Sequence, residues 1–159
     1  MKIIYIHHGN RKNGNPPSEH DDLTKLGYKD CKLVAKLFNR DKIKSHLKAI
    51  YTSPYFRCRI TAEILNKKLN VKLIEDARLN EFNRDQEKWI NLQKRVGACI
   101  DDITHHYNDD DIVICVTSGV NISAFINKAY GLPPSEKAPF LLIPSCSPIV
   151  FDYKTKEKK

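Results

Sequence analysis

The chain has 159 residues, of which 41% are hydrophobic and 29% charged, and its formal net charge at pH 7 is +8. Length and composition predict one globular domain, residues 1–153, followed by a basic C-terminal tail, residues 154–159. No apolar run reaches the ~18 residues of a membrane span, and His7 interrupts the apolar N-terminal stretch. We therefore expect neither a membrane anchor nor a signal peptide, and a cytoplasmic protein.

The basic charge does not favour a nucleic-acid partner. Lysines and arginines are spread along the chain and do not form one stripe, and a lysine-rich tail is most simply a solvated chain end. A basic surface can still attract a small phosphorylated molecule.

The cysteines are scattered, without Cys-x-x-Cys spacing. This pattern argues against a disulfide framework and against a zinc site. We expect reduced thiols that fill the core: Cys31, Cys58, Cys99, Cys115 and Cys146.

Apolar runs alternate with helical periodicities along the sequence. Strands are predicted over residues 2–7, 48–52, 71–75, 112–117 and 148–153, and helices over 22–39, 54–69, 84–106 and 121–130. This alternation is typical of an α/β fold, a three-layer α/β/α sandwich with a mainly parallel central sheet. Trp89 belongs to an amphipathic helical pattern and is expected in the core. Residues 10–22 form the one long loop and are a candidate lid.

The first predicted strand ends at His7, His8 and Gly9. In open α/β sheets, ligands bind at the carboxyl ends of the strands, so this is a candidate site. Neighbouring residues on a strand point to opposite faces, so these histidines are not expected to bind one metal together. One of them can face a pocket while the other faces elsewhere.

Three later segments place polar side chains after a strand. Ser53 and Arg57 follow the second strand, with Ser53 placed as the N-cap of the next helix. Glu81 follows the third strand, and Ser118 follows the fourth. We expect these side chains to converge with His8 at the carboxyl end of the sheet.

With these four segments the chain resembles the histidine phosphatase superfamily, in the branch that includes cofactor-dependent phosphoglycerate mutases and small phosphomonoesterases. Residues 7–9 stand where that family has Arg-His-Gly, residues 53–57 match Ser-Pro-x-x-Arg, residues 79–81 match Leu-x-Glu, and residues 23–27 match Leu-Thr-x-x-Gly. The resemblance implies that His8 is the nucleophile that accepts the phosphoryl group. It also implies that Arg57 clamps the phosphate and that Glu81 donates a proton to the leaving oxygen.

Two positions depart from the family pattern. His7 stands where the family has an arginine, and Ser118 where it has a second catalytic histidine. A histidine offers fewer donors than an arginine, and its charge depends on pH. We expect His7 and Ser118 to contact phosphate beside Arg57, with Arg11 returning part of the missing charge. His20, in the long loop, is a candidate replacement for the histidine absent at position 118.

The resemblance implies a phosphomonoesterase-type phosphatase that forms a phosphohistidine on a small phosphorylated substrate, without metal or cofactor. This chemistry needs a neutral imidazole held in one tautomer and an acid that is protonated when the leaving group departs. The chain is short, so mutase activity is less expected than hydrolysis, and the two departures predict attenuated activity. An alternative stays open: an inactive member that binds a phosphorylated ligand or a protein partner. The oligomeric state also stays open.

Overall fold

The computed structural model describes residues 1–12 and 18–153, so the predicted tail 154–159 and part of the predicted lid, 13–17, lie outside the described residues. Within these ranges one five-stranded sheet has the strand order β3-β2-β4-β1-β5. β1 to β4 are parallel, and β5 runs antiparallel to β1 at one edge. The strands are β1 Lys2–His7, β2 Leu47–Thr52, β3 Lys72–Glu75, β4 Ile112–Thr117 and β5 Pro148–Asp152.

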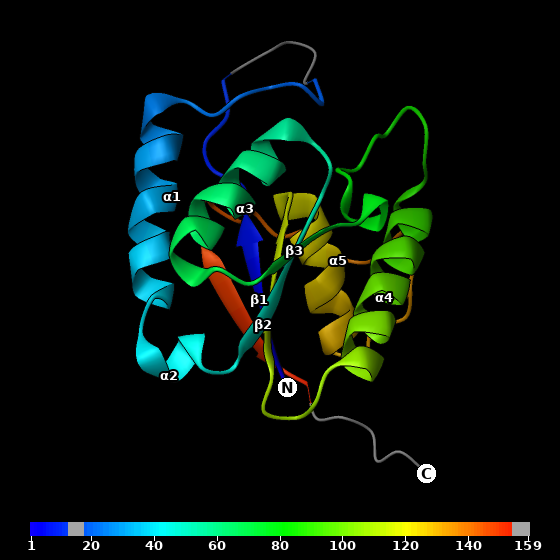
Figure 1. The fold of residues 1–159 in the computed structure, drawn as a ribbon. Coiled ribbons are helices and arrows are strands. Elements are labelled where there is room, and N and C mark those ends of the chain that lie inside the picture. Colours follow the sequence, from blue (N-terminus) through cyan, green and yellow to red (C-terminus); the bar gives the residue numbers. More distant parts are fainter. Residues whose placement is uncertain (13–17, 154–159) are drawn as a thin grey trace.

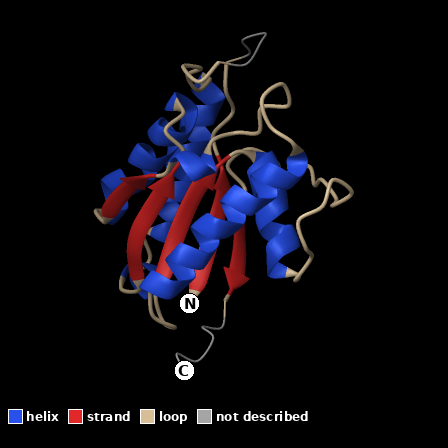
Figure 2. Cartoon of the chain, turned by 90° about the vertical axis from the view of Figure 1, so that its right-hand side faces the viewer, coloured by secondary structure: helices blue, strands red, loops and turns tan. Residues whose placement is uncertain are grey.

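Helices cover both faces of the sheet (Figures 1 and 2). α1 and α3 pack on one face, whereas α4 and α5 pack on the other. The helices are α1 Lys25–Phe38, α2 Asp41–Lys44, α3 Phe56–Leu69, α4 Trp89–His106 and α5 Gly119–Ala129. The predicted α/β fold with a mainly parallel, helix-covered sheet is confirmed. In the described ranges, none of these helices has both the length and the apolar character to cross a membrane.

Alternate residues of β1 supply two separate apolar cores. Ile4 and Ile6 pack in the core under α1 and α3, whereas Ile3 and Tyr5 pack in the core under α4 and α5. His8 N donates to Thr117 O at 3.0 Å, so the pairing with β4 extends one residue beyond β1. The same alternation points His7 and His8 to opposite faces of the sheet.

The start of α4 differs from the prediction. The helix begins at Trp89 instead of residue 84, because a turn at Asn83 occupies the preceding segment: Asn83 O accepts from Glu87 N at 2.9 Å. Trp89 is 4% exposed and its ring nitrogen donates to Ala138 O at 3.0 Å, so its predicted place in the core is confirmed. The loop between residue 79 and α4 is therefore longer than expected.

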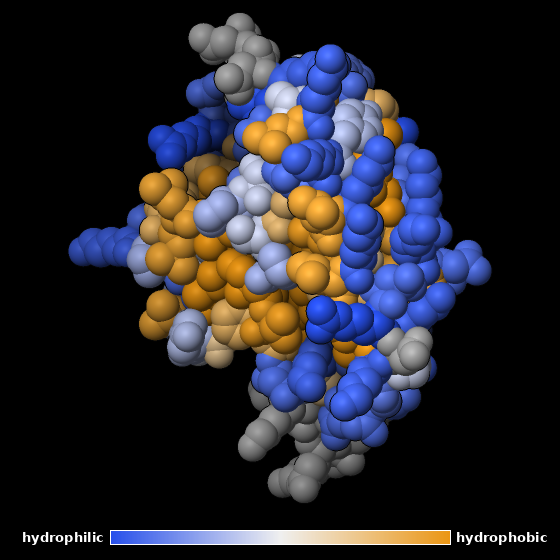
Figure 3. Space-filling view, turned by 90° about the vertical axis from the view of Figure 1, so that its left-hand side faces the viewer, coloured by the Kyte–Doolittle hydropathy of each residue, from blue (hydrophilic) through white to orange (hydrophobic). Residues whose placement is uncertain are grey.

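Apolar side chains gather on the face that carries α1 (Figure 3). Leu26, Leu33 and Leu37 of this helix are each about half exposed. Their spacing of seven and four residues puts them on one side of the helix, away from the side that enters the core. α1 therefore buries one apolar side and leaves a second uncovered in the single chain.

Candidate active site

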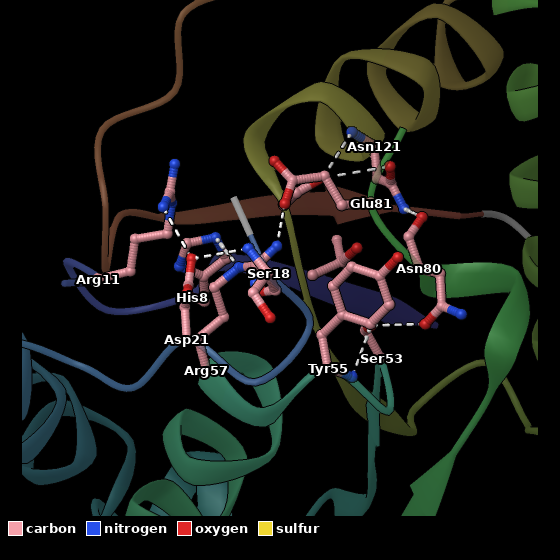
Figure 4. Close-up of polar contacts among 12 residues, drawn as sticks. His8, Arg11, Ser18, Asp21, Ser53, Tyr55, Arg57, Asn80, Glu81 and Asn121 are labelled. Atoms are coloured by element: carbon pink, nitrogen blue, oxygen red, sulfur yellow. Dashed lines mark hydrogen bonds and ion pairs between the residues drawn. The ribbon is translucent and has the colours of Figure 1, made fainter. Parts of the chain in front are cut away.

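His8 lies directly after β1 with both ring nitrogens engaged (Figure 4). Nδ1 is 2.8 Å from Gly9 O, and because a carbonyl oxygen only accepts, Nδ1 carries the hydrogen. Nε2 is then the unprotonated nitrogen, and it accepts from Arg57 Nε at 3.2 Å. The contacts thus fix one tautomer, with the free electron pair of Nε2 directed at the arginine.

The surroundings of His8 keep its ring uncharged. The pKa of His8 is lowered to about 3, chiefly by burial and to a smaller extent by the nearby His7 and Arg57. At neutral pH the imidazole therefore has the uncharged form that a nucleophile needs.

Arg57 lies in the first turn of α3 and is 1% exposed. Besides the bond to His8, its Nη1 donates to Ser18 O at 2.8 Å and its Nη2 forms an ion pair with Glu81 Oε2. The guanidinium carbon lies 5.0 Å from the centre of the Tyr55 ring. The structure thus brings His8, Arg57 and Glu81 into direct contact.

Ser53 does not cap α3, so the predicted N-cap is wrong. The helix begins at Phe56 with Tyr55 as its N-cap, and the Tyr55 side chain makes no capping hydrogen bond. Ser53 Oγ instead accepts from Tyr55 N at 3.2 Å and donates to Asn80 Oδ1 at 2.9 Å. Because Asn80 directly precedes Glu81, Ser53 helps to position the loop that carries this carboxylate.

Ser118 is the N-cap of α5. Its Oγ accepts from Asn121 N at 3.4 Å and lies 3.2 Å from Asn121 Oδ1. In the described part of the chain this hydroxyl bonds to Asn121 and not to His8 or Arg57. The structure therefore places Ser118 at the carboxyl end of β4, as expected, but its hydroxyl is hydrogen-bonded to the first turn of α5.

Asn121 is a residue that the sequence did not single out. Its side chain is fully buried, and Nδ2 donates to Leu79 O at 2.8 Å and to Asn80 O at 2.9 Å. These bonds tie the loop that carries Glu81 to α5 (Figure 4). The sequence shows only that an asparagine stands three residues after Ser118. That spacing is also typical of a residue near a helix N-cap, so it does not indicate a bond to the loop that carries Glu81.

His7 faces the α5 side of the sheet. Its Nδ1 donates to Ile143 O at 2.7 Å, and burial lowers its pKa. A Cβ at Gly119 would lie 3.2 Å from the ring, so the glycine makes room for it. The Nδ1 of His7 is thus bonded to Ile143 O, although the centre of the His7 ring is only 4.5 Å from that of His8.

Arg11 forms an ion pair with Asp21 at 2.9 Å, between Arg11 Nη1 and Asp21 Oδ2. Its positive charge still contributes to lowering the pKa of His8. Arg11 is therefore close enough to act on the site electrostatically while its own guanidinium is partly neutralised. Among the described residues, no group of three or more His, Cys, Asp and Glu side chains is arranged to hold a metal ion.

A cavity of about 240 Å³ is lined in part by Tyr55, whose ring centre lies 5.0 Å from the Arg57 guanidinium carbon. His20 is largely exposed on its wall and lies 3.4 Å from Glu19, between Nε2 and Oε1. Of the residues that line the cavity, the sequence singled out this histidine and Pro54, which belongs to the Ser-Pro-x-x-Arg match. The other polar or aromatic residues of the lining are Glu19, Tyr55, Phe56, Arg59 and Asn80.

Solved structures share this fold. YhfR from Bacillus stearothermophilus has a TM-score of 0.79 at 19% identity, over 94% of this chain and 89% of that one. The mycobacterial glucosyl-3-phosphoglycerate phosphatase Rv2419c with VO3 has a TM-score of 0.75 at 15% identity, over 94% and 90%. The protein histidine phosphatase SixA with tungstate has a TM-score of 0.71 at 15% identity, over 94% and 86%. No curated protein sequence matches the chain.

A sequence model of one family also matches the chain. The match to the histidine phosphatase superfamily (branch 1) covers residues 7–86 and 83–159. It begins at His7, and its range includes His8, Arg57, Glu81 and Ser118. Since the match spans nearly the whole sequence, the chain belongs to the histidine phosphatase superfamily (branch 1).

Proposed function

We propose that the protein is a phosphatase that hydrolyses a small phosphomonoester through a phosphohistidine on His8. The observation that carries the proposal is the neutral, single-tautomer imidazole whose Nε2 meets a buried guanidinium. A nucleophile needs a free electron pair, and a phosphoryl group needs a fixed positive charge beside it. Two of the similar structures, both named as phosphatases, contain the oxoanions VO3 and tungstate.

In the first step the phosphate replaces the Glu81 carboxylate on Arg57. His8 Nε2 then forms a bond to phosphorus while the bond from phosphorus to the ester oxygen breaks. Glu81 is displaced but still adjacent, and it takes up a proton from solvent because the negative phosphate favours its protonated form. Glu81 can therefore give its proton to the departing oxygen, as the resemblance implies.

In the second step water attacks the phosphohistidine. The carboxylate of Glu81 takes a proton from this water, the bond between phosphorus and nitrogen breaks, and phosphate leaves. His8 Nε2 recovers its electron pair, and Glu81 releases the proton to solvent when it pairs with Arg57 again. Arg57 holds the phosphoryl oxygens through both transfers.

The leaving group is proposed to occupy the cavity lined by Tyr55, the residue whose ring lies against the Arg57 guanidinium. At about 240 Å³ this cavity suits a small organic group, such as one sugar or one ring. Tyr55 offers an aromatic wall, and Arg59 and Asn80 offer polar contacts. A small phosphorylated metabolite therefore fits this site better than a bulky one.

The proposed activity is attenuated because few groups are free to stabilise the transition state. His7 is neutral and bonded to Ile143 O, and the Ser118 hydroxyl is bonded to Asn121. One observation favours the second candidate, an inactive protein that binds a phosphorylated ligand. Each of the three guanidinium nitrogens of Arg57 already donates to a neighbour: to His8, to Ser18 O and to Glu81.

A turnover assay on a panel of phosphomonoesters tests the proposal, with His8→Ala as the active-site variant. The control is His46→Ala, which removes an exposed histidine at the opposite end of the sheet. We expect turnover that falls by ~10³-fold or more in His8→Ala and is unchanged in His46→Ala. Rapid quenching in alkali, which preserves phosphohistidine, should trap a phosphoenzyme in the wild type and in His46→Ala but not in His8→Ala.

Two results would contradict the proposal. Full activity in His8→Ala would remove the nucleophile assignment. Tungstate binding without turnover or phosphoenzyme would favour the inactive binding protein.

A further inference from the structure

Two cysteines far apart in the sequence meet directly behind the nucleophile. Cys31 Sγ and Cys146 Sγ are 3.3 Å apart, although 115 residues separate them. Both thiols are free and buried. Within the described residues, no hydrogen bond joins the thiols of the other three cysteines. They are Cys58, Cys99 and Cys115.

The pair lies against the backbone of the active-site loop. A Cβ on Gly9 would be only 2.7 Å from Cys31 Sγ, so α1 presents this thiol to the residue that follows His8. Cys146 N donates to His7 O at 2.9 Å, which fixes the other thiol behind the end of β1. Thr61 Oγ1 accepts from Gly9 N at 3.0 Å and lies 3.6 Å from Cys31 Sγ.

We propose that Cys31 and Cys146 form an oxidative modification site, at which a hydroperoxide joins them in a reversible disulfide. One thiol attacks the peroxide, the O–O bond breaks, and a sulfenic acid and one water form. The second thiol attacks the sulfenic sulfur, the S–S bond forms, the S–O bond breaks, and a second water leaves. Two thiols and one hydrogen peroxide thus give one disulfide and two waters, and the thiols supply the two electrons.

Three features of the pair favour this reaction. A disulfide needs sulfurs at ~2.05 Å, so they must approach by little more than ~1 Å. Cys146 lies in a loop and is 7% exposed, against 0% for Cys31, so Cys146 is the member of the pair nearer to solvent. The contact with Cys146 also lowers the pKa of the Cys31 thiol, which favours the reactive thiolate.

The disulfide would join α1 to the segment before β5 and close a loop of more than 100 residues. A loop of this length restricts the unfolded chain strongly, so Tm is expected to rise by about 10 °C on oxidation. This inference does not depend on the proposed phosphatase activity.

The experiment titrates the reduced, folded, full-length protein with hydrogen peroxide and counts free thiols. We expect the five thiols to fall to three, the mass to fall by ~2 Da, and non-reducing peptide mapping to give one crosslink, between Cys31 and Cys146. Dithiothreitol should restore the thiols and the original Tm. Cys31→Ser and Cys146→Ser should each prevent the crosslink, whereas Cys58→Ser, at a buried cysteine of α3, should leave it intact.

The peptide map of the wild type decides the question even where a serine variant fails to fold. Crosslinks among other cysteines, or sulfinic and sulfonic acids at Cys31 or Cys146 without a crosslink, would overturn the proposal. So would a disulfide that forms only after denaturation.

Discussion

Arg57 and Glu81 form an ion pair in which the arginine side chain is 1% exposed and the glutamate side chain 32% exposed. The same guanidinium donates to His8 Nε2, so the proposed nucleophile, clamp and acid form one continuous chain of contacts. A phosphate that binds to Arg57 must therefore compete with Glu81. This competition makes the glutamate a barrier to binding as well as the proposed acid.

Glu81→Gln should separate these two roles. Removing the negative charge weakens the competitor, so tungstate should bind about three- to tenfold more tightly, roughly 1 kcal/mol. Turnover should fall, and it should fall more for alkyl phosphates than for p-nitrophenyl phosphate, whose leaving group needs little help from an acid. Calorimetry measures the affinity, and steady-state kinetics measures the dependence on the leaving group.

The matched control for this charge is Glu63→Gln, at an exposed position on α3. It should change neither quantity. An equal loss of turnover for both classes of ester would show that Glu81 is not the acid.

Ser118→His should raise phosphatase turnover above that of the wild type, because it supplies the side chain that the family pattern has at this position. A donor to the transition state in a preorganised site is commonly worth ~2.7–4 kcal/mol. The variant also loses the N-cap of α5, which should cost about 1 kcal/mol in the free energy of unfolding. Kinetics and urea unfolding measure the two effects separately.

Ser118→Ala isolates the loss of the cap and should lower stability without raising turnover. A folded Ser118→His that gains nothing over Ser118→Ala would count against an attenuated enzyme. It would favour the inactive binding protein.

The sheet could be predicted because its signals are local. Apolar runs of strand length alternate with helical periodicity. This pattern predicts where the strands lie and that the parallel strands have their carboxyl ends at the same end of the sheet. The start of α4 could not be predicted, because residues 84–88 contain good helix formers. Tertiary contacts override that propensity: Arg95 Nε on α4 donates to Glu87 Oε2 at 3.0 Å, which holds the segment outside the helix.

For the side chains of the site, the sequence predicts only which strand each one follows, and not which contacts it makes. The sequence places His8, Arg57, Glu81 and Ser118 at one edge of the sheet, but it does not say which donor meets which acceptor. Bonds such as that from Asn121 Nδ2 to Leu79 O join residues far apart in the chain, and such bonds depend on how loops settle after the sheet has formed. The contact between the Cys31 and Cys146 thiols could not be predicted for the same reason.

The stability of the protein should depend on pH through His8. The pKa of this residue is about 3 in the folded chain, against 6.5 for an unperturbed histidine. Between these values the unfolded chain binds a proton that the folded chain excludes, so the free energy of unfolding should fall as pH falls, by up to ~1.4 kcal/mol per pH unit. Above pH 6.5 both states are neutral at this residue, and its contribution is constant.

His8→Gln should flatten this dependence, since an amide does not titrate. Urea unfolding at several pH values between 7.5 and 4.5 measures the slope. His7 adds to the slope in the same direction because burial lowers its pKa too, so the variant should reduce the slope without abolishing it. His46→Gln, at an exposed histidine, should leave the slope as it is in the wild type. Equal slopes in His8→Gln and the wild type would mean that the folded chain does not keep His8 neutral.

His7→Arg should tighten oxoanion binding by one charge-assisted contact, about 1.5–3 kcal/mol or roughly 10- to 100-fold in Kd. In the wild type, burial lowers the pKa of His7, so the ring stays neutral at pH 7 and gains charge only below its ordinary value of 6.5. Tungstate affinity in the wild type should therefore change little between pH 8 and 7 and rise only at lower pH. An arginine is charged throughout, so the variant should bind tightly already at pH 8.

A Cβ at Gly119 would lie only 3.2 Å from the present ring, so the absence of a side chain at Gly119 leaves room for the longer side chain at position 7. His7→Gln is the neutral control: it removes the imidazole without adding charge and should not tighten binding at pH 8. Calorimetric titrations with tungstate across the pH range measure both variants. If His7→Arg leaves the affinity and its pH profile as they are in the wild type, residue 7 does not face the anion, and Arg57 with Arg11 supplies the positive charge of the site.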